Sequence, residues 1–386
     1  MFQKAQTIVV VFHDFPLGGS ERIAIRLMNR WAEMGRKVVA FCGTRQGPLA
    51  SFISSKVEIV ECAPAIPRSV SSRFHLAQAL IAFLKKTRCD VVFAPGSFHW
   101  PILTPLAALP DGERPTVITQ ISTPLYRHGR GPLKQVLYNL LARYYLRCAD
   151  ATIALATATI SEADRVLRRS ITEHIRLPVL EDASDNEPLE RADGNLIVVA
   201  GRLVKEKGFD VAIRAFAMIK DRTARLIILG DGPKRAELEE LAASLGVAGR
   251  IEFKGYVPDI TPWLKACRLF LLSSYYEGYG AVIVEALAAG RPVVSTDCTP
   301  AVSDLLATAP GCVVTPIGDA TAMSHAIDQA LSMAPANPRA LAAAVRNYRL
   351  GPIATAHLDL FDRVHALKAN LRGAATQLFP EEMAYV

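Results

Sequence analysis

Residues 269–290 read LFLLSSYYEGYGAVIVEALAAG, an apolar run followed by a glycine-broken loop and a helical pattern. This order predicts a strand, a loop and a helix, the crossover unit of a parallel α/β sheet. The loop then lies at the carboxyl end of its strand, where open α/β sheets bind their ligands. Glu277 falls in the loop and Glu285, eight residues later, in the helix.

These two carboxylates admit a functional and a structural interpretation. A carboxylate can accept two hydroxyl hydrogen bonds at once, as a sugar or ribose diol requires, and Gly278 and Gly280 allow backbone to approach a ligand closely. A glutamate in a loop or helix is, however, often a solvated charge. Glu285 lies in an apolar helix, where an acid is seldom buried without a partner. From these residues alone the two interpretations are about equally favoured.

The same alternation of apolar runs and helical patterns covers the whole chain, which predicts βαβ units and parallel sheets. At 386 residues the chain is long enough for two domains, each with a full core. Helices are predicted between the strands, the last at 352–371. Strands are predicted at 7–12, 37–42, 57–60, 90–94, 116–121, 151–155, 195–200, 224–229, 250–254, 268–272, 292–296 and 311–314.

An acidic stretch with few apolar residues interrupts this pattern and is interpreted as a linker. The predicted organisation is an N-terminal domain at 1–180, the linker at 181–194, a C-terminal domain at 195–350 and a final helix and tail at 351–386.

Two further segments at predicted strand ends suit an anionic ligand. Gly201 and Arg202 follow one strand and Lys207 precedes the next helix. A helix N-terminus beside an arginine and a lysine can bind a pyrophosphate, although from the residues alone a pair of solvated surface cations is the commoner explanation. Gly18 and Gly19 follow the first strand and precede Ser20, a residue suited to the N-cap, but glycines also simply make turns.

Together these segments resemble the retaining nucleotide-sugar glycosyltransferases of the GT-B fold, most closely family 4. Glu277 and Glu285 match the family's Glu-x7-Glu motif. The resemblance implies two Rossmann-like domains with parallel sheets facing a cleft, and a C-terminal helix that crosses back to the first domain. It spans nearly the whole chain and also includes AGRLVKEKG at 200–208, ILGDGP at 228–233 and GGSER at 18–22.

The resemblance also implies roles for single residues. Arg202 and Lys207 would stabilise the departing diphosphate in place of a metal, so no cofactor is expected. Glu277 would hold a hydroxyl of the donor sugar, and Glu285 the ribose hydroxyls. The implied donor-binding set is Gly18, Gly19, Gly201, Arg202, Lys207, Gly255, Tyr256, Val257, Glu277, Gly278, Tyr279, Gly280 and Glu285.

The sequence departs from this family in two places. Many members carry a histidine after an N-terminal strand, near the reacting carbon, yet residues 117–124 contain none. His13, His99 and His128 are the remaining candidates, and His99 ranks first as a catalytic residue because its strand end should face the cleft. A lone histidine is more often structural, and a retaining reaction can proceed without an enzymic base. Residues 298–304 also lack the family's Gly-Gly and Glu.

The charge of the chain is uneven. Residues 1–150 carry 19 Lys and Arg against 9 Asp and Glu, a balance of +10, within a net charge of +7 for the whole chain. A basic half attracts an anionic acceptor or an anionic membrane surface, and no nucleic-acid-binding motif is present. The helix at 132–148 mixes basic and aromatic residues. Packing as a crossover helix is favoured over a membrane role for it.

The function implied by the resemblance is transfer of a sugar from a UDP- or GDP-sugar to a glycan or lipid-linked acceptor, in synthesis of cell-surface polysaccharide or glycolipid. The alternatives are a degenerate relative that binds another transferase and a sugar-nucleotide epimerase. No signal peptide or long uncharged apolar stretch is seen, and the 7 cysteines are scattered. We therefore expect a cytoplasmic protein, with peripheral attachment to the inner face of the membrane as a further hypothesis.

Overall fold

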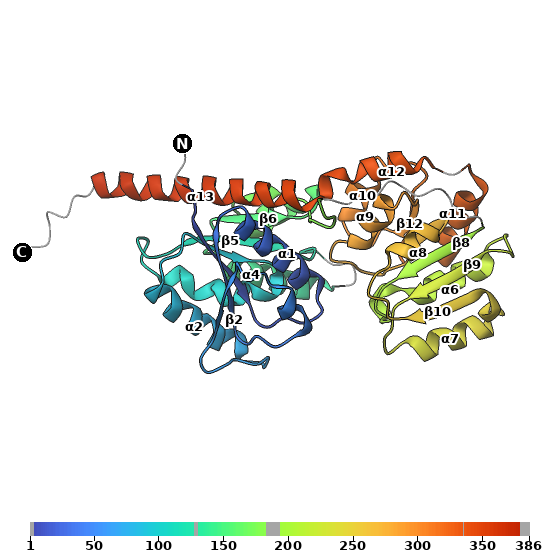
Figure 1. The fold of residues 1–386 in the computed structure, drawn as a ribbon, viewed down its shortest axis with the longest axis horizontal. Helices are drawn as coiled ribbons and strands as arrows, with labels where there is room; N and C mark the ends of the chain where they lie inside the picture. Colours follow the sequence, from blue (N-terminus) through green and yellow to red (C-terminus); the bar gives the residue numbers. More distant parts are fainter. Residues whose placement is uncertain (1–3, 127–129, 183–193, 335, 379–386) are drawn as a thin grey trace, which may run out of the picture. The chain divides into compact units, whose positions relative to one another are not determined.

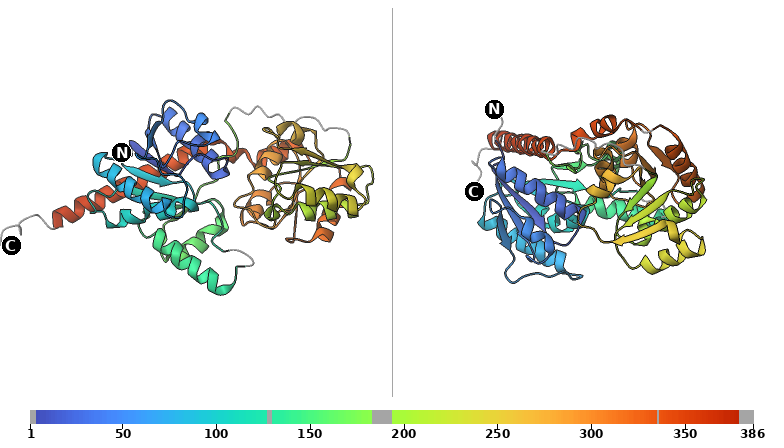
Figure 2. Two further views of the ribbon diagram at one scale, coloured as in Figure 1. Left: turned by 90° about the horizontal axis from the view of Figure 1, so that it is seen from below. Right: turned by 45° about the vertical axis from the view of Figure 1, so that its right-hand side comes forward.

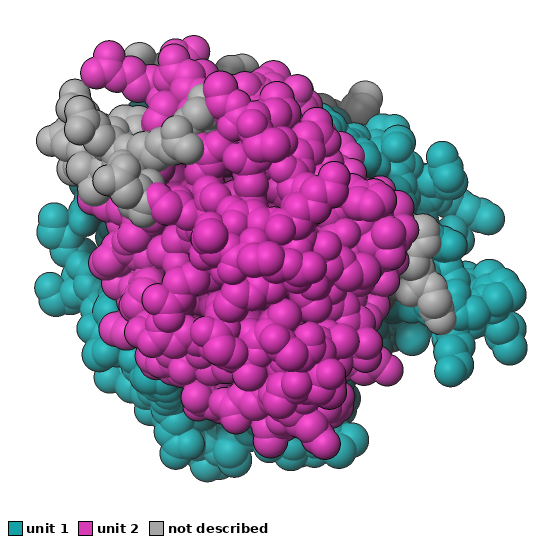
Figure 3. Space-filling view, turned by 90° about the vertical axis from the view of Figure 1, so that its right-hand side faces the viewer, with its two compact units in different colours: residues 1–178, 350–386 teal, residues 179–349 magenta. Residues whose placement is uncertain are grey.

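The structure is a computed structural model that describes residues 4–126, 130–182, 194–334 and 336–378 (Figure 1). It divides into two compact units, which Figure 3 colours separately. Unit 1 comprises residues 1–178 and 350–386, and unit 2 comprises residues 179–349. Most of the predicted linker, residues 183–193, lies outside the described residues.

Unit 1 is built on a parallel seven-stranded sheet in the order β3-β2-β1-β4-β5-β6-β7. Its inner strands are buried on both faces, which is why they read as continuous apolar runs. The strands are β1 (Thr7–Phe12), β2 (Lys37–Cys42), β3 (Glu58–Glu61), β4 (Val91–Ala94), β5 (Thr116–Ile121), β6 (Ala151–Ala154) and β7 (Thr172–His174).

Helices cover both faces of this sheet (Figure 2). Residues of α2 and α3 share one apolar cluster with β1, β2 and β4, while α1 and α13 pack together against the other face. The α-helices are α1 (Gly19–Glu33), α2 (Ser72–Lys86), α3 (Trp100–Leu103), α4 (Pro132–Tyr145), α5 (Thr157–Leu167) and α13 (Leu350–Leu378).

The C-terminal helix α13 completes the core of unit 1. The indole of Trp31 in α1 lies between Phe93 of β4 and Phe361 of α13, at ring-centroid distances of 5.7 and 5.2 Å. Its Nε1 donates a hydrogen bond to the carbonyl of Ala354, at 3.2 Å. The prediction that the last helix returns to the first domain is therefore confirmed.

Unit 2 is built on a parallel six-stranded sheet in the order β10-β9-β8-β11-β12-β13. Its strands are β8 (Leu196–Ala200), β9 (Arg225–Leu229), β10 (Ile251–Gly255), β11 (Leu269–Leu272), β12 (Val293–Thr296) and β13 (Val313–Thr315). Its α-helices are α6 (Phe209–Met218), α7 (Arg235–Ser244), α8 (Thr261–Ala266), α9 (Ala281–Ala288), α10 (Ala301–Leu306), α11 (Ala320–Ser332) and α12 (Pro338–Ala344).

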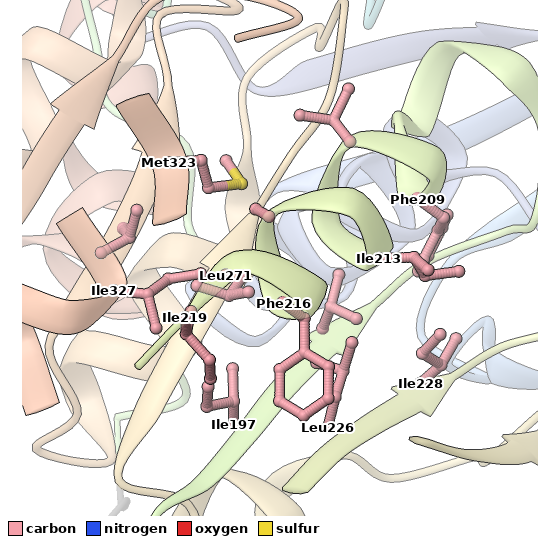
Figure 4. Packing of buried hydrophobic residues seen from close by; sticks show 14 of the residues in the cluster. Ile197, Phe209, Ile213, Phe216, Ile219, Leu226, Ile228, Leu271, Met323 and Ile327 are labelled. Carbon is pink, nitrogen blue, oxygen red and sulfur yellow. The ribbon is translucent and has the colours of Figure 1, made fainter. Parts of the chain in front are cut away.

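Helix α6 fixes one face of this second sheet. Phe209, Ile213 and Phe216 point from α6 into a buried cluster, where they meet side chains of β8, β9, β11 and α11 (Figure 4). Helix α6 begins directly after the loop that follows β8. Because its apolar face is buried in the core, the helix anchors the end of that loop.

The predicted fold class, two α/β domains with parallel sheets, is confirmed, and the predicted strands are all present within two residues. Strand β7 was missed because its three residues, Thr-Glu-His, carry no apolar signal. Two helix starts differ from expectation. Gly18, not Ser20, occupies the N-cap position of α1, and α13 begins at Leu350, with Pro352 inside its first turn, where its missing N–H breaks no helical bond.

Candidate functional site

The strand order of unit 2 reverses between β8 and β11, which are neighbours in the sheet. At such a switch point the loops that follow the carboxyl ends of the two strands run in opposite directions, and the crevice between them can bind a ligand. The loop after β8 (201–208) and the loop after β11 (273–280) meet at this point. They contain the predicted phosphate-binding and sugar-binding residues.

Lys207 and Glu277 form the centre of the site. Lys207 Nζ donates to Glu277 Oε1 at 2.6 Å, and Ser274 Oγ donates to the same oxygen at 2.8 Å. The Glu277 side chain is 11% exposed and that of Lys207 30% exposed. Among the described residues no donor contacts Glu277 Oε2. This oxygen therefore remains available to accept a ligand hydroxyl, and the lysine carries its positive charge at the surface of the loop.

Close backbone packing holds these two loops together. Gly208 has φ +60, and a Cβ atom there would lie 2.1 Å from the carbonyl oxygen of Ser273. Ser273 Oγ donates to the Lys207 carbonyl at 3.2 Å, and the Tyr275 N–H donates to the Glu206 carbonyl at 2.9 Å. Because only glycine fits at position 208, the loops approach closely enough for Lys207 to reach Glu277.

Glycines at neighbouring strand ends extend this backbone surface. Gly230, after β9, has φ +136, and a Cβ atom there would lie 1.9 Å from the carbonyl oxygen of Gly201. The Gly230 N–H donates to the carbonyl of Gly255 at 2.7 Å. The glycine backbones at the ends of β8, β9 and β10 thus lie close together, and glycines at strand ends suit close approach by a phosphate or a base.

The other predicted residues of unit 2 surround this centre. Arg202 is exposed and makes no ion pair among the described residues. Tyr256 is exposed just beyond β10, and Val257 is half-buried. Glu285 is half-buried in α9, which begins after Gly280 at φ +85.

The segment that departs from the family pattern supports the acidic loop. The Glu277 N–H donates to the carbonyl of Cys298 at 3.3 Å, and Thr299 Oγ1 donates to the carbonyl of Gly278, also at 3.3 Å. Tyr279 is buried beside them. Residues 298 and 299 thus help to position the loop through its backbone, in a way that requires no Gly-Gly.

A second polar cluster lies at the switch point of unit 1, between β1 and β4. Asp14 follows β1 and accepts hydrogen bonds from Arg68 Nε at 2.8 and 2.7 Å and from Arg68 Nη2 at 2.5 Å. The Arg68 guanidinium also lies 4.6 Å from the ring centroid of Phe98. Arg68 is therefore held within the protein by both a carboxylate and an aromatic ring.

His99 and His13 belong to the same cluster and are almost fully buried, at 1% and 0% exposure. Neither imidazole has a hydrogen-bond partner within the described residues. Burial lowers the pKa of His99 to about 3 and also lowers the pKa of His13. Both rings are therefore neutral near pH 7. Gly18 and Gly19 start α1 in this unit, and His128 lies outside the described residues.

We expect burial of His99 to make folding sensitive to acid. Below the ordinary pKa of 6.5 the unfolded chain takes up a proton that the folded chain does not accept until about pH 3. The free energy of unfolding therefore falls as the pH falls through this interval, by about 2 kcal/mol between pH 7.5 and 5 from this residue alone. Urea unfolding at both pH values should show this loss reduced in His99→Gln. An unchanged loss in the variant would show that His99 titrates normally.

Sequence reasoning missed Ser274 and the pair formed by Asp14 and Arg68. Ser274 is the second residue after β11, and a hydroxyl near a strand end is a signal that could have identified it. The contact between Asp14 and Arg68 joins residues 54 positions apart, which no local pattern predicts. No three His, Cys, Asp or Glu side chains lie together as a metal centre would need in the part of the chain that the structure describes.

Family models match both halves of the chain. One described as Glycosyl transferases group 1 matches residues 181–347, and one described as Glycosyltransferase Family 4 matches residues 17–175. The lipopolysaccharide core biosynthesis glycosyltransferase LpsE of Rhizobium meliloti is 44% identical over 105 residues, which are 27% of this chain and 30% of that protein. The matched segments span less than half of the first curated relatives.

Solved structures resemble the chain over nearly its whole length. Anabaena Alr3699/HepE, in complex with UDP and glucose, has a TM-score of 0.67 at 18% identity and covers 96% of this chain and 100% of its own. The apo lipopolysaccharide outer core galactosyltransferase WaaB has a TM-score of 0.72 at 16% identity, with coverage of 94% and 99%. At these identities the likeness shows the fold. With a glycosyltransferase model matched on each half, the chain belongs to the glycosyltransferases.

Proposed function

We propose that this glycosyltransferase transfers a sugar, with retention of configuration, from a UDP- or GDP-sugar to a glycan or lipid-linked acceptor of cell-surface polysaccharide or lipopolysaccharide. The observation that carries the proposal is the contact between Lys207 and Glu277 at the switch point of unit 2. It combines a cation suited to a diphosphate with a carboxylate suited to a sugar hydroxyl.

The charges of the site fit the leaving group of such a reaction. Departure of a nucleoside diphosphate builds negative charge on its phosphate oxygens, and fixed cations stabilise that charge in the transition state. Lys207 is fixed by its bond to Glu277, while Arg202 is exposed on the same loop and can turn toward a phosphate. Glu277 Oε2 would accept a hydroxyl of the donor sugar, and Glu285 the ribose hydroxyls.

The relatives support the class of donor and acceptor. The HepE structure is a complex with UDP and glucose, which favours a uridine nucleotide here. LpsE and WaaB are named for lipopolysaccharide core synthesis, which favours an acceptor that carries negative charge. The balance of +10 over residues 1–150 agrees with such an acceptor binding to unit 1.

A thermal-shift screen of UDP, GDP and their common sugars, with NAD as control, tests the donor. A ligand at a hundredfold its Kd stabilises the folded state by about 2.7 kcal/mol, so the true nucleotide should raise Tm clearly. Hydrolysis of that donor sugar, with the configuration of the released sugar followed by NMR, then tests the reaction. Binding without any turnover would favour a degenerate binding partner, and no shift with any nucleotide would reject the donor site.

We expect donor turnover to need no metal, because Lys207 and Arg202 supply the positive charge at the phosphate site. The rate in an excess of the chelator EDTA should equal the rate in buffer alone. Recovery of a lost rate on adding Mg²⁺ or Mn²⁺ would contradict this expectation.

A further inference from the structure

Three polar side chains of helix α4 bind it to the rest of unit 1. Gln135 is buried, and its Nε2 donates to the carbonyl of Leu125 at 3.0 Å and to Asn139 Oδ1 at 2.8 Å. Arg143 Nε donates to the carbonyl of Val166 at 3.0 Å. Gln135, Asn139 and Arg143 are spaced four residues apart and therefore lie on one face of the helix. Tyr138, Ala142 and Tyr145 pack beside this face into an apolar cluster of unit 1, so polar and apolar contacts together hold α4 in place.

The outward face of α4 is apolar and exposed. A surface helix of a globular protein usually turns polar residues to the solvent, so an apolar outer face in addition to the inward contacts is unusual. As predicted, α4 connects β5 to β6, but the prediction that it simply packs as a crossover helix does not account for this face. The exposed side chains, between 41% and 82% accessible, are Leu133, Val136, Leu137, Leu140, Leu141 and Tyr144.

The surroundings of this apolar face are strongly cationic. From Arg130 to Ala149 the sequence has no acidic residue, and Lys134 and Arg147 are its exposed cations. The Arg147 guanidinium lies 4.1 Å from the ring centroid of Tyr144, and the Arg147 carbonyl accepts a hydrogen bond from Arg169 at 3.3 Å. A further set of exposed cations therefore adjoins the C-terminal end of α4: Arg165, Arg168 and Arg169.

We propose that α4 binds to the surface of an anionic lipid bilayer, with its leucines at the boundary of the acyl chains and its cations at the lipid phosphates. An exposed apolar helix face bordered by Lys and Arg has the chemistry of an interfacial helix. A second copy of the chain is a poorer occupant. A two-fold contact through this face would bring the same cations of both copies together without opposing acids.

The proposed attachment is to one surface of the bilayer. In the described ranges no helix is long and apolar enough to cross a membrane. The inference is independent of the sugar-transfer reaction, because it rests on the surface of unit 1 alone. Donor hydrolysis measured without lipid tests the sugar-transfer proposal, and vesicle binding tests the membrane proposal, so the failure of either can be told from the failure of the other.

Co-sedimentation of the full chain with vesicles tests the proposal. Wild type should bind vesicles of phosphatidylglycerol and phosphatidylcholine but not phosphatidylcholine alone, and salt should weaken the binding. Leu137→Ser/Leu141→Ser should lower the partition coefficient about tenfold or more, since it removes two apolar side chains that would insert into the bilayer. Leu367→Ser/Leu371→Ser, an equally spaced pair of exposed leucines on α13, is the matched control and should bind as wild type.

A fluorescent side chain on the same face gives an independent readout. Trp31 and Trp100 are buried and Trp263 is half-buried in unit 2, so the difference in emission between Tyr144→Trp and wild type reports on α4. Anionic vesicles should shift that emission to the blue. Three results would overturn the proposal: no vesicle binding by wild type, equal binding by the α4 double variant, or a dimer in solution that dissociates in that variant and does not bind lipid.

Discussion

Replacing Lys207 by alanine is expected to reduce kcat about 10²- to 10³-fold. The substitution removes the cation proposed to face the departing diphosphate, and a preorganised charge of this kind contributes rate on that scale. It also removes one of the two donors to Glu277 Oε1, so the half-buried carboxylate loses the bond that orients it. Steady-state kinetics with the nucleotide sugar found by thermal shift would measure the loss.

Lys205→Ala is the matched control for this variant. Lys205 lies in the same short 3-10 helix, Lys205–Lys207, but is exposed and makes no ion pair among the described residues. Removing it changes the net charge by the same amount as Lys207→Ala does, and it should alter kcat less than about twofold. If the two variants have the same rate, Lys207 acts only through the general charge of the loop, and the assignment of the phosphate site is wrong.

Gly208→Ala is expected to destabilise unit 2 by about 2–4 kcal/mol and to impair turnover as well. The residue has φ +60, which disfavours any side chain by about 1 kcal/mol. A Cβ atom would also lie 2.1 Å from the carbonyl oxygen of Ser273, which is backbone and cannot rotate away. Relief requires the two loops to separate. Separation of about 1 Å between Lys207 and Glu277 can lower kcat by up to about a hundredfold.

Gly246→Ala separates the two causes of this loss. Gly246 has φ +67, close to that of Gly208, but no atom lies within 4 Å of its Cβ position. It should therefore lose only the conformational part, about 1 kcal/mol, and keep its kcat. Urea unfolding of both variants gives the comparison. Equal losses of stability would mean that the contact between the loops does not hold the site together.

Unit 2 illustrates what sequence predicts well. Its strands are buried on both faces, so a short apolar run between turn residues is sufficient to locate each one. The switch point follows from strand order, and glycine loops at strand ends identify the side where a ligand binds. The positions of Lys207 and Glu277 on that side were predictable. Their contact was not, because it depends on how closely Gly208 packs against Ser273.

Unit 1 shows the limit of such reasoning. His99 was chosen for its place after a strand, but its burial depends on Phe12 and Phe98, whose rings lie 6.2 and 5.4 Å from the imidazole. Packing of this kind joins separate parts of the sequence and leaves no periodic signal. The same holds for α4, whose composition indicates two different faces but does not tell which face is turned outward.

The packing of α13 also determines the order in which the molecule can be completed during synthesis. Trp31 and Phe93 emerge from the ribosome early, whereas Phe361, which covers them, is made only after all of unit 2. Chains generally fold domain by domain as they are translated. Unit 1 is synthesised first but cannot complete its fold until α13 has been made. Until α13 docks, the nascent unit exposes an aromatic surface to which chaperones can bind.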